Sequence, residues 1–488
     1  MHIDSMTFPS PPRSPSPTHR GPSESSAHTA YLRPHQYQLT NTSTPDLSRV
    51  ASPTETVVDL PATATALGEI PSNFLNAAAY SAPAPAQNAT GPQRKVNRIA
   101  RRVHGWTWQA FPVGMGTGAV YVTMSGLKDR SPALKTIETV FFFINLSLFC
   151  LNVTTLAIQA LLYPRQAKRL VTDPSKNIFV PLVVLSFATI VIGTINYAII
   201  PGLIHPRLVY VLFWIYVGFS VIVSFPLLMI WYNRPHDIKT FTPAWMFLVF
   251  PMMLVGVVAF NVLKVMDPAD ERAVGVLFVG YFFQGIGSMV TLLYLAVYFM
   301  RIMTTGFMEG HQANGAFVAC GPPGFTALAL INLGARAREI LPLHGIMSDI
   351  AGEVWYASSV LGALLLFGFA IFLVLFGALP YWFKLHKHLN EILGCWALTF
   401  PNVGWIGSLG ALADALKIPG LRTVQVVCVI IIAGLWLVLA TLTVVAFWRG
   451  LILRSQCDAV LADAEHKLFV SEKQDPRLDH RSSFIHVV

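Results

Sequence analysis

Few polar side chains interrupt the long apolar runs of this sequence, and Asn332 and Arg336 are the pair with the clearest chemistry. They are four residues apart, so both lie on one face of a helix. Arginine binds a carboxylate through two parallel hydrogen bonds. The pair therefore predicts a site for a small carboxylate anion. The same position, near a helix end, equally suits an arginine that only extends to the lipid–water interface.

Exposed backbone amides are the second kind of candidate for binding an anion. Gly116, Thr117 and Gly118 lie together in the first apolar run, and a helix that is broken there would expose N–H groups, which favour negative charge. Asn402 adds an amide side chain in a later run. Taken singly, each of these polar groups could instead bond only to a neighbouring helix.

The elements that must position these residues are membrane-spanning helices. The chain has 488 residues, of which 54% are hydrophobic and 12% charged, about half the charged fraction of a soluble protein. The apolar residues form runs of about 20 or more, long enough to cross a bilayer. We therefore predict an all-α integral membrane protein, with about ten helices near residues 106–125, 137–162, 178–200, 208–231, 243–264, 273–300, 315–335, 352–379, 391–413 and 422–448.

Composition also argues against several classes of function. The net charge of +9 comes largely from residues that flank the runs, so it gives no indication of nucleic-acid binding. The five cysteines form no CxxC pair, and we expect neither a metal nor a cofactor. The runs contain no HExxH motif and no nucleophile elbow, so we expect no enzyme. Carboxylates are almost absent from their interiors, which argues against a chain of acidic residues relaying protons.

Prolines recur inside the odd-numbered runs at intervals of about 70 residues, and about 80 at the last step. This spacing predicts five helical hairpins around a central pore. The first helix of each would be kinked and line the pore, and the second would face lipid. The alternative is that proline is simply tolerated in membrane spans. The prolines are Pro112, Pro181, Pro251, Pro322 and Pro401.

Two polar tails flank the predicted transmembrane domain at 101–450. Residues 1–100 form the N-terminal tail, which we expect to be disordered because residues 1–90 are rich in Pro, Ser and Thr. A basic cluster that includes Arg98, Arg101 and Arg102 ends this tail and predicts a cytosolic N-terminus. An even number of spans then places the C-terminal tail, 451–488, in the cytosol as well.

Three motifs carry a resemblance to a known family. They are GMGTG from Gly114, GPPGFTALALIN from Gly321 and TFPNVGW from Thr399. Over about residues 104–450 the chain resembles the tellurite-resistance/dicarboxylate transporter family, and within it the fungal malate permeases. The sulfite efflux pumps of that family resemble GPMG and TFPMG at these places, where this sequence has Pro323 and Asn402.

The resemblance implies the ten-helix fold of the plant slow-type anion channels, a homotrimer, and a phenylalanine that occludes the pore. Phe400 is the matching residue, although it could also be one more packed aromatic. The implied function is transport of four-carbon dicarboxylates, chiefly malate and also succinate, across the plasma membrane. A sulfite efflux pump or another small-anion channel of the same fold is the alternative. Proton coupling stays open.

Overall fold

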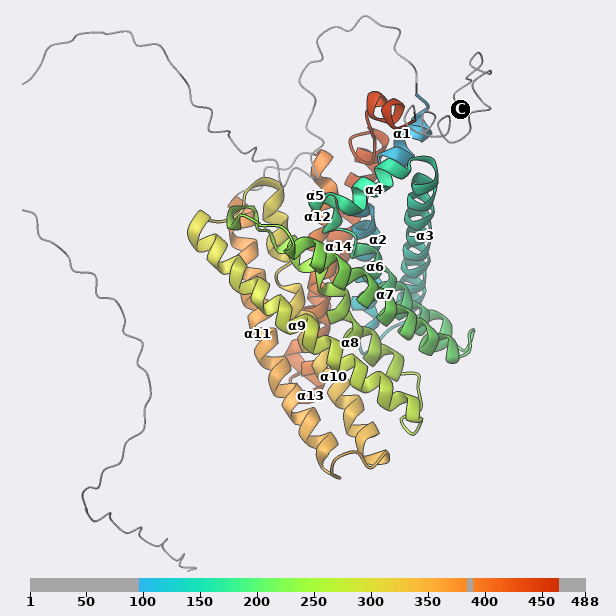
Figure 1. Cartoon of the computed structure of the whole chain (residues 1–488). Helices are drawn as coiled ribbons and strands as arrows, with labels where there is room; N and C mark the ends of the chain where they lie inside the picture. Colours follow the sequence, from blue (N-terminus) through green and yellow to red (C-terminus); the bar gives the residue numbers. More distant parts are fainter. Residues whose placement is uncertain (1–95, 384–388, 465–488) are drawn as a thin grey trace, which may run out of the picture. The chain divides into compact units, whose positions relative to one another are not determined.

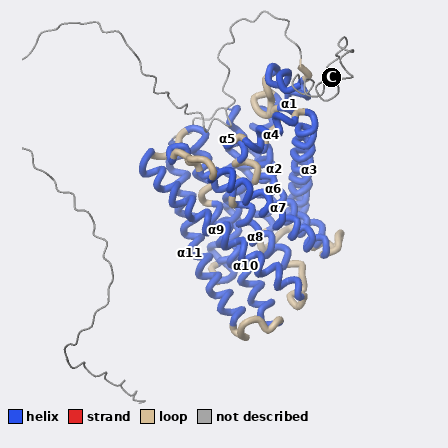
Figure 2. Tube along the Cα trace, in the orientation of Figure 1, coloured by secondary structure: helices blue, strands red, loops and turns tan. Residues whose placement is uncertain are grey.

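The computed structural model describes residues 96–383 and 389–464, which belong to one compact unit. Within these two ranges the chain is helical and contains no strand (Figure 2). The predicted all-helical membrane fold is therefore confirmed. Residues 1–95 of the predicted N-terminal tail and 465–488 of the predicted C-terminal tail lie outside the described residues.

Five helical hairpins build this unit, and in each hairpin the first helix packs against the second (Figure 1). The first helices also contact one another in chain order, and the last contacts the first again, so they form a closed inner ring. The pairs are α2 (Phe111–Ser125) with α3 (Pro132–Leu162), α6 (Leu182–Thr194) with α7 (Arg207–Tyr232), α8 (Phe250–Leu263) with α9 (Glu271–Thr305), α10 (Gly321–Leu343) with α11 (Ala351–Phe383), and α13 (Val403–Leu416) with α14 (Pro419–Trp448).

Burial separates the inner helices from the outer ones. In the spans that contain α6, α10 and α13, 72–89% of the most apolar stretch is buried, and all fourteen residues of α8 are buried. In the five outer helices the buried share is only 17–33%. Because their exposed residues are largely aliphatic and aromatic, the outer helices suit contact with lipid, as the proline pattern predicted.

Length distinguishes the ten helices further. Eight helical segments of the described chain are long and apolar enough to cross a membrane. The other two, α2 and α8, have 15 and 14 residues, and each is preceded by a 3-10 segment, η2 (Trp108–Ala110) or η5 (Pro243–Leu248). About ten spans were predicted, and the two shorter helices complete that number in the inner ring.

The kinks predicted at the five prolines take the form of helix starts. Pro112, Pro251 and Pro322 lie in the first turn of α2, α8 and α10, and Pro181 is the N-cap of α6. Pro401 lies in the 3-10 helix η9 (Phe400–Asn402), which leads into α13. A proline in the first turn removes an N–H that has no helical partner in any case. Each inner segment is thus an irregular stretch followed by a regular α-helix.

Short elements connect the hairpins. One of them, η3 (Ile195–Ile199), is a π-helix that continues α6, and such segments occur often at functional sites. The others are α1 (Arg98–His104), α4 (Pro164–Thr172), α5 (Pro174–Asn177), η4 (Ile238–Thr240), η6 (Gly310–Phe317), η7 (Leu389–Glu391), α12 (Ile392–Cys395) and η8 (Trp396–Leu398).

The segment after α14 folds back onto α1. The Arg101 Nε donates to the Ser455 carbonyl at 2.9 Å, and the Arg102 guanidinium donates to the Ile452 carbonyl at 2.6 Å. His104 contacts Asp463 at 3.1 Å, and both side chains are buried. Part of the predicted tail is therefore packed against the unit, and two arginines of the basic cluster hold it there.

Candidate functional site

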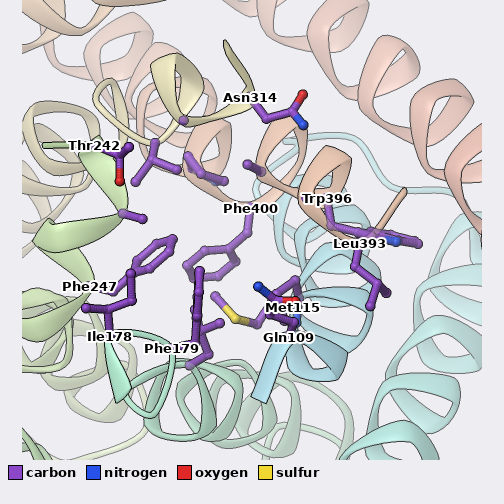
Figure 3. A pocket seen from close by; sticks show the side chains of 18 of the residues that line it. Gln109, Met115, Ile178, Phe179, Thr242, Phe247, Asn314, Leu393, Trp396 and Phe400 are labelled. Atoms are coloured by element: carbon purple, nitrogen blue, oxygen red, sulfur yellow. The ribbon is translucent and has the colours of Figure 1, made fainter. Parts of the chain in front are cut away.

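The N-terminal ends of the five inner helices enclose a cavity of about 140 Å³, which we name the N-end cavity. Its walls are mostly apolar, and Figure 3 shows Phe179, Phe247 and Phe400 facing the space. No charged side chain is among the described residues that line it. Because helix N-termini carry partial positive charge, the backbone alone favours an anion here. The polar lining consists of Gln109, Ser175, Thr242, Gln312 and Asn314.

The C-terminal parts of the same five helices enclose a second space of about 290 Å³, the C-end cavity. Hydroxyl and amide groups make much of its surface, and three charged residues also line it. The neutral polar groups belong to Thr123, Ser125, Thr189, Asn196, Asn261 and Asn332, and the charged ones are Lys264, Asp414 and Arg422. This is the region of the described chain where a small hydrophilic solute would find both hydrogen-bond donors and positive charge.

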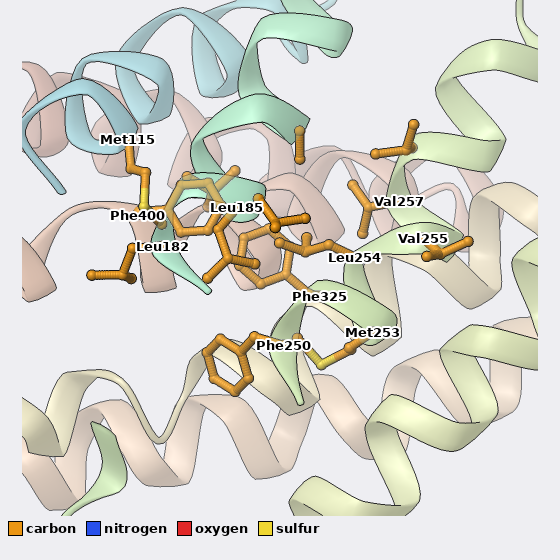
Figure 4. Close-up of a cluster of buried hydrophobic side chains, with 14 of the residues drawn as sticks. Met115, Leu182, Leu185, Phe250, Met253, Leu254, Val255, Val257, Phe325 and Phe400 are labelled. Carbon is orange, nitrogen blue, oxygen red and sulfur yellow. The ribbon is translucent and has the colours of Figure 1, made fainter. Parts of the chain in front are cut away.

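Phe400 is the one residue in the described linings of both cavities. Its side chain is 8% exposed, and its ring centroid lies 5.2 Å from that of Phe325 on α10. Figure 4 shows both rings within a cluster of apolar side chains that includes Leu185 and Leu254 from the facing inner helices. The two cavities thus meet at an apolar constriction formed by these side chains.

Local hydrogen bonds fix the turn that carries Phe400. The Thr399 hydroxyl donates to the Trp396 carbonyl at 2.7 Å. The Asn402 amide donates to the Leu398 carbonyl at 2.7 Å and accepts from the Trp405 indole at 2.7 Å. Asn402 lines neither cavity. The amide of Asn402, one of the predicted substrate-binding residues, thus bonds within the turn that carries Phe400.

Comparison with known sequences decides the family. The profile of the SLAC1 family, described as voltage-dependent anion channel, matches residues 105–444, well over half of the chain. The chain belongs to the SLAC1 family. The matched range contains every described residue that lines either cavity, so the cavities lie within the part that the family shares.

Relatives within the SLAC1 family carry two kinds of names. The malic acid transport protein of Schizosaccharomyces pombe is 27% identical over 353 residues, 72% of this chain and 80% of its own. A second protein of that organism, for which malic acid transport is a provisional name, is 27% identical over 362 residues, 73% of this chain and 83% of its own. The sulfite efflux pump SSU1 of Trichophyton rubrum is 26% identical over 347 residues, 70% of this chain and 89% of its own. The names of these relatives thus refer to malic acid on the one hand and to sulfite on the other.

The backbone candidates Gly116, Thr117 and Gly118 line neither cavity. An added methyl group on Gly116 would collide with the Trp396 ring, and one on Gly118 would lie 2.9 Å from Thr189. The Thr117 hydroxyl donates to the Val113 carbonyl and accepts from the Trp436 indole of α14, both within 3.0 Å. In this SLAC1-family chain the three residues therefore let neighbouring elements pack closely.

The predicted pair of Asn332 and Arg336 does not act as one unit. Asn332 lines the C-end cavity, and its amide donates to the Leu328 carbonyl at 2.8 Å. Arg336 lies outside the lining and forms an ion pair with Glu339 at 2.7 Å. Asn332 therefore lies at the cavity, whereas the Arg336 guanidinium is paired with Glu339 outside it.

Sequence reasoning missed the charged groups that do line the C-end cavity. Lys264 directly follows the last residue of α8, at the end of the predicted run 243–264. Arg422, near the start of α14, pairs with Asp414 and donates to the Gly126 carbonyl at 3.2 Å. One signal was available for Lys264, because Asn261 precedes it by three residues at the end of an apolar run and so lies on the same helical face.

Proposed function

We propose that this SLAC1-family chain transports four-carbon dicarboxylates, chiefly malate, through the ring of inner helices and performs no enzymatic reaction. The observation that carries the proposal is the C-end cavity, where amides, hydroxyls and an ammonium group surround a space beside the constriction at Phe400. A dicarboxylate carries several acceptor oxygens, which such donors suit. Relatives named for malic acid transport support malate as the first anion to test.

Phe400 is the proposed gate between the two cavities. An anion in either cavity would have to displace an apolar ring to reach the other, because the constriction offers it no polar partner. Asn402 then acts on the gate through the turn, and Asn332 acts on the solute from the cavity wall. The roles proposed for the two asparagines are therefore different in kind.

Sulfite export is the second candidate. The relatives named sulfite efflux pump match a similar share of this chain at similar identity. The motif difference that favours malate includes Asn402, and the amide of that residue bonds to the gate turn rather than lining a cavity. Because Asn402 contacts the gate turn and not the cavity, the motif does not distinguish malate from sulfite, and a transport assay must do so.

Location and assembly belong to the same proposal. We infer a homotrimer in the plasma membrane with both termini in the cytosol, following the family resemblance. The basic residues of α4 and α5 support this orientation, because Arg165, Lys168, Arg169 and Lys176 lie near the N-terminal ends of the inner helices. Proton-coupled uptake is the finer hypothesis for energy coupling.

The experiment is transport in liposomes that contain the purified full-length chain. We expect labelled malate to enter, unlabelled succinate to compete and sulfite to compete poorly, and an inward proton gradient to increase uptake if transport is coupled. Empty liposomes, and liposomes with a heat-denatured chain, are the controls. Sulfite flux without malate flux would assign the chain to sulfite export and contradict the proposal.

A further inference from the structure

Lys264 occupies an unusual place among the cations of this molecule. It is the residue directly after α8, its side chain is solvent-accessible, and it lines the C-end cavity. Its Nζ donates to the Asn261 Oδ1 at 2.9 Å and lies 5.0 Å from the centroid of the Phe260 ring. An ammonium group has three donor hydrogens, so two remain for a solute.

Three arginines around this end of the molecule are already paired with carboxylates. Arg130 contacts Glu138 at 3.0 Å and Arg336 contacts Glu339 at 2.7 Å, whereas Lys264 forms no ion pair within residues 96–383 and 389–464. Arg130 and Arg336 are also close enough to repel the Lys264 ammonium. The pairs are Arg130–Glu138, Arg336–Glu339 and Arg422–Asp414.

Asn261 holds this ammonium in place. Its amide nitrogen donates to the Val257 carbonyl at 2.9 Å, which orients the amide oxygen toward the Lys264 Nζ. Among the described residues this solvent-accessible ammonium has one neutral hydrogen-bond partner and no carboxylate within ion-pair distance. An anion in the cavity would form a charge-assisted hydrogen bond with it.

From this geometry we infer that Lys264 binds one carboxylate of a small organic anion in the C-end cavity, with Asn261 as its positioning residue. The rest of the anion would face the amides and hydroxyls of the same lining, among them Asn332, Asn196 and Ser125. The inference rests on the proposed function for the choice of malate, but the binding site itself is defined by the residues of the cavity.

Binding of malate to the purified full-length chain, measured by titration calorimetry, tests the inference. Lys264→Gln removes the charge, and we expect its dissociation constant for malate to rise about tenfold to a hundredfold, because hydrogen bonds to charged groups are the strong ones. Lys264→Arg keeps the charge and should stay within about threefold of the wild type. Lys128→Gln is the matched control, since Lys128 is exposed after α2 at the same end of the molecule and outside the cavity lining.

Asn261→Ala provides a second variant in case Lys264→Gln does not fold. The melting temperature without malate shows whether each variant is folded. This variant leaves the charge but frees the ammonium, so we expect several-fold weaker binding. Unchanged affinity in Lys264→Gln, or in Asn261→Ala if only that variant folds, would overturn the inference. A wild type that binds no malate would also overturn it. A wild type that binds malate at Lys264 but does not transport it would contradict only the proposed function.

Discussion

The two cavities are built by the same five inner helices, yet their chemistry differs. The N-end cavity is lined by Phe179, Phe247 and other apolar groups, with no charged side chain in the described lining. The C-end cavity is lined by asparagines, hydroxyls and Lys264. All five helices run from the first cavity towards the second. Helix N-termini bring partial positive charge to the first cavity, and C-termini bring partial negative charge to the second.

This difference in backbone charge explains where basic side chains are needed. An anion in the N-end cavity is favoured by five helix N-termini, so apolar walls can surround it without opposing it. An anion in the C-end cavity meets the unfavourable ends of the same helices. Lys264 supplies positive charge at that end, since Arg422 is paired with Asp414 of the same lining. Positive charge thus comes from helix ends at the first cavity and from a side chain at the second, and the apolar constriction at Phe400 lies between them.

Removing the constriction should have the largest effect. We expect Phe400→Ala to raise the passive flux of small anions on the order of tenfold or more, because the two cavities would become continuous. Flux of labelled malate and of chloride in liposomes measures it. Phe179→Ala is the control, since Phe179 lines only the N-end cavity. Equal flux in both variants would show that Phe400 does not separate the cavities.

Close packing of α10 against α13 provides a second prediction, with a smaller effect, on stability. An added methyl group on Gly404 would collide with the Phe325 backbone, and one on Gly324 would lie 2.7 Å from the Trp405 nitrogen. We expect Gly404→Ala to cost about 1–3 kcal/mol or more, because α10 and α13 would have to separate. Its melting temperature in detergent should fall by several degrees.

Gly434 offers the matched control for that prediction. It is exposed on the outer helix α14, and an added methyl group meets no atom within 4 Å. Gly434→Ala should leave stability unchanged or raise it by up to about 1 kcal/mol, since alanine favours a helix. If Gly404→Ala were as stable as Gly434→Ala, the close contact between α10 and α13 would not contribute to stability.

Sequence patterns predicted the ring but not the surface that it encloses. Prolines at regular intervals identified the inner helices because proline marks helix starts. Which face of an inner helix meets a cavity could not be predicted, since helices such as α8 are apolar and buried on all sides. Gly116 and Thr117 line neither cavity, whereas Asn332 lines the C-end cavity. The place of Lys264 in the lining of the C-end cavity could be recognised only from the closed ring of inner helices.

A titratable contact lies outside the spans, on the side of the N-end cavity. At the N-end side, His104 bonds to Asp463 and Ser455, packs against the Tyr163 ring, and lies within the electrostatic influence of Arg169 and Lys176. Burial lowers the pKa of His104 below its ordinary value, although Asp463 opposes that shift. The neutral imidazole therefore holds the C-terminal segment on α1.

Acidification should weaken this contact, which is the smallest effect that we predict. The unfolded chain takes up a proton near pH 6.5, whereas the folded chain resists it, so the stabilisation is complete above about pH 6.5 and is lost as the pH falls below it. The measurement is limited proteolysis after Leu461 or nearby sites between pH 7.5 and 5.5. His104→Gln keeps the hydrogen-bonding groups without titrating, and its cleavage should change less with pH. His205→Gln, in an exposed loop, should behave like the wild type. Parallel pH profiles of cleavage for the wild type and His104→Gln would exclude His104 as the titrating group.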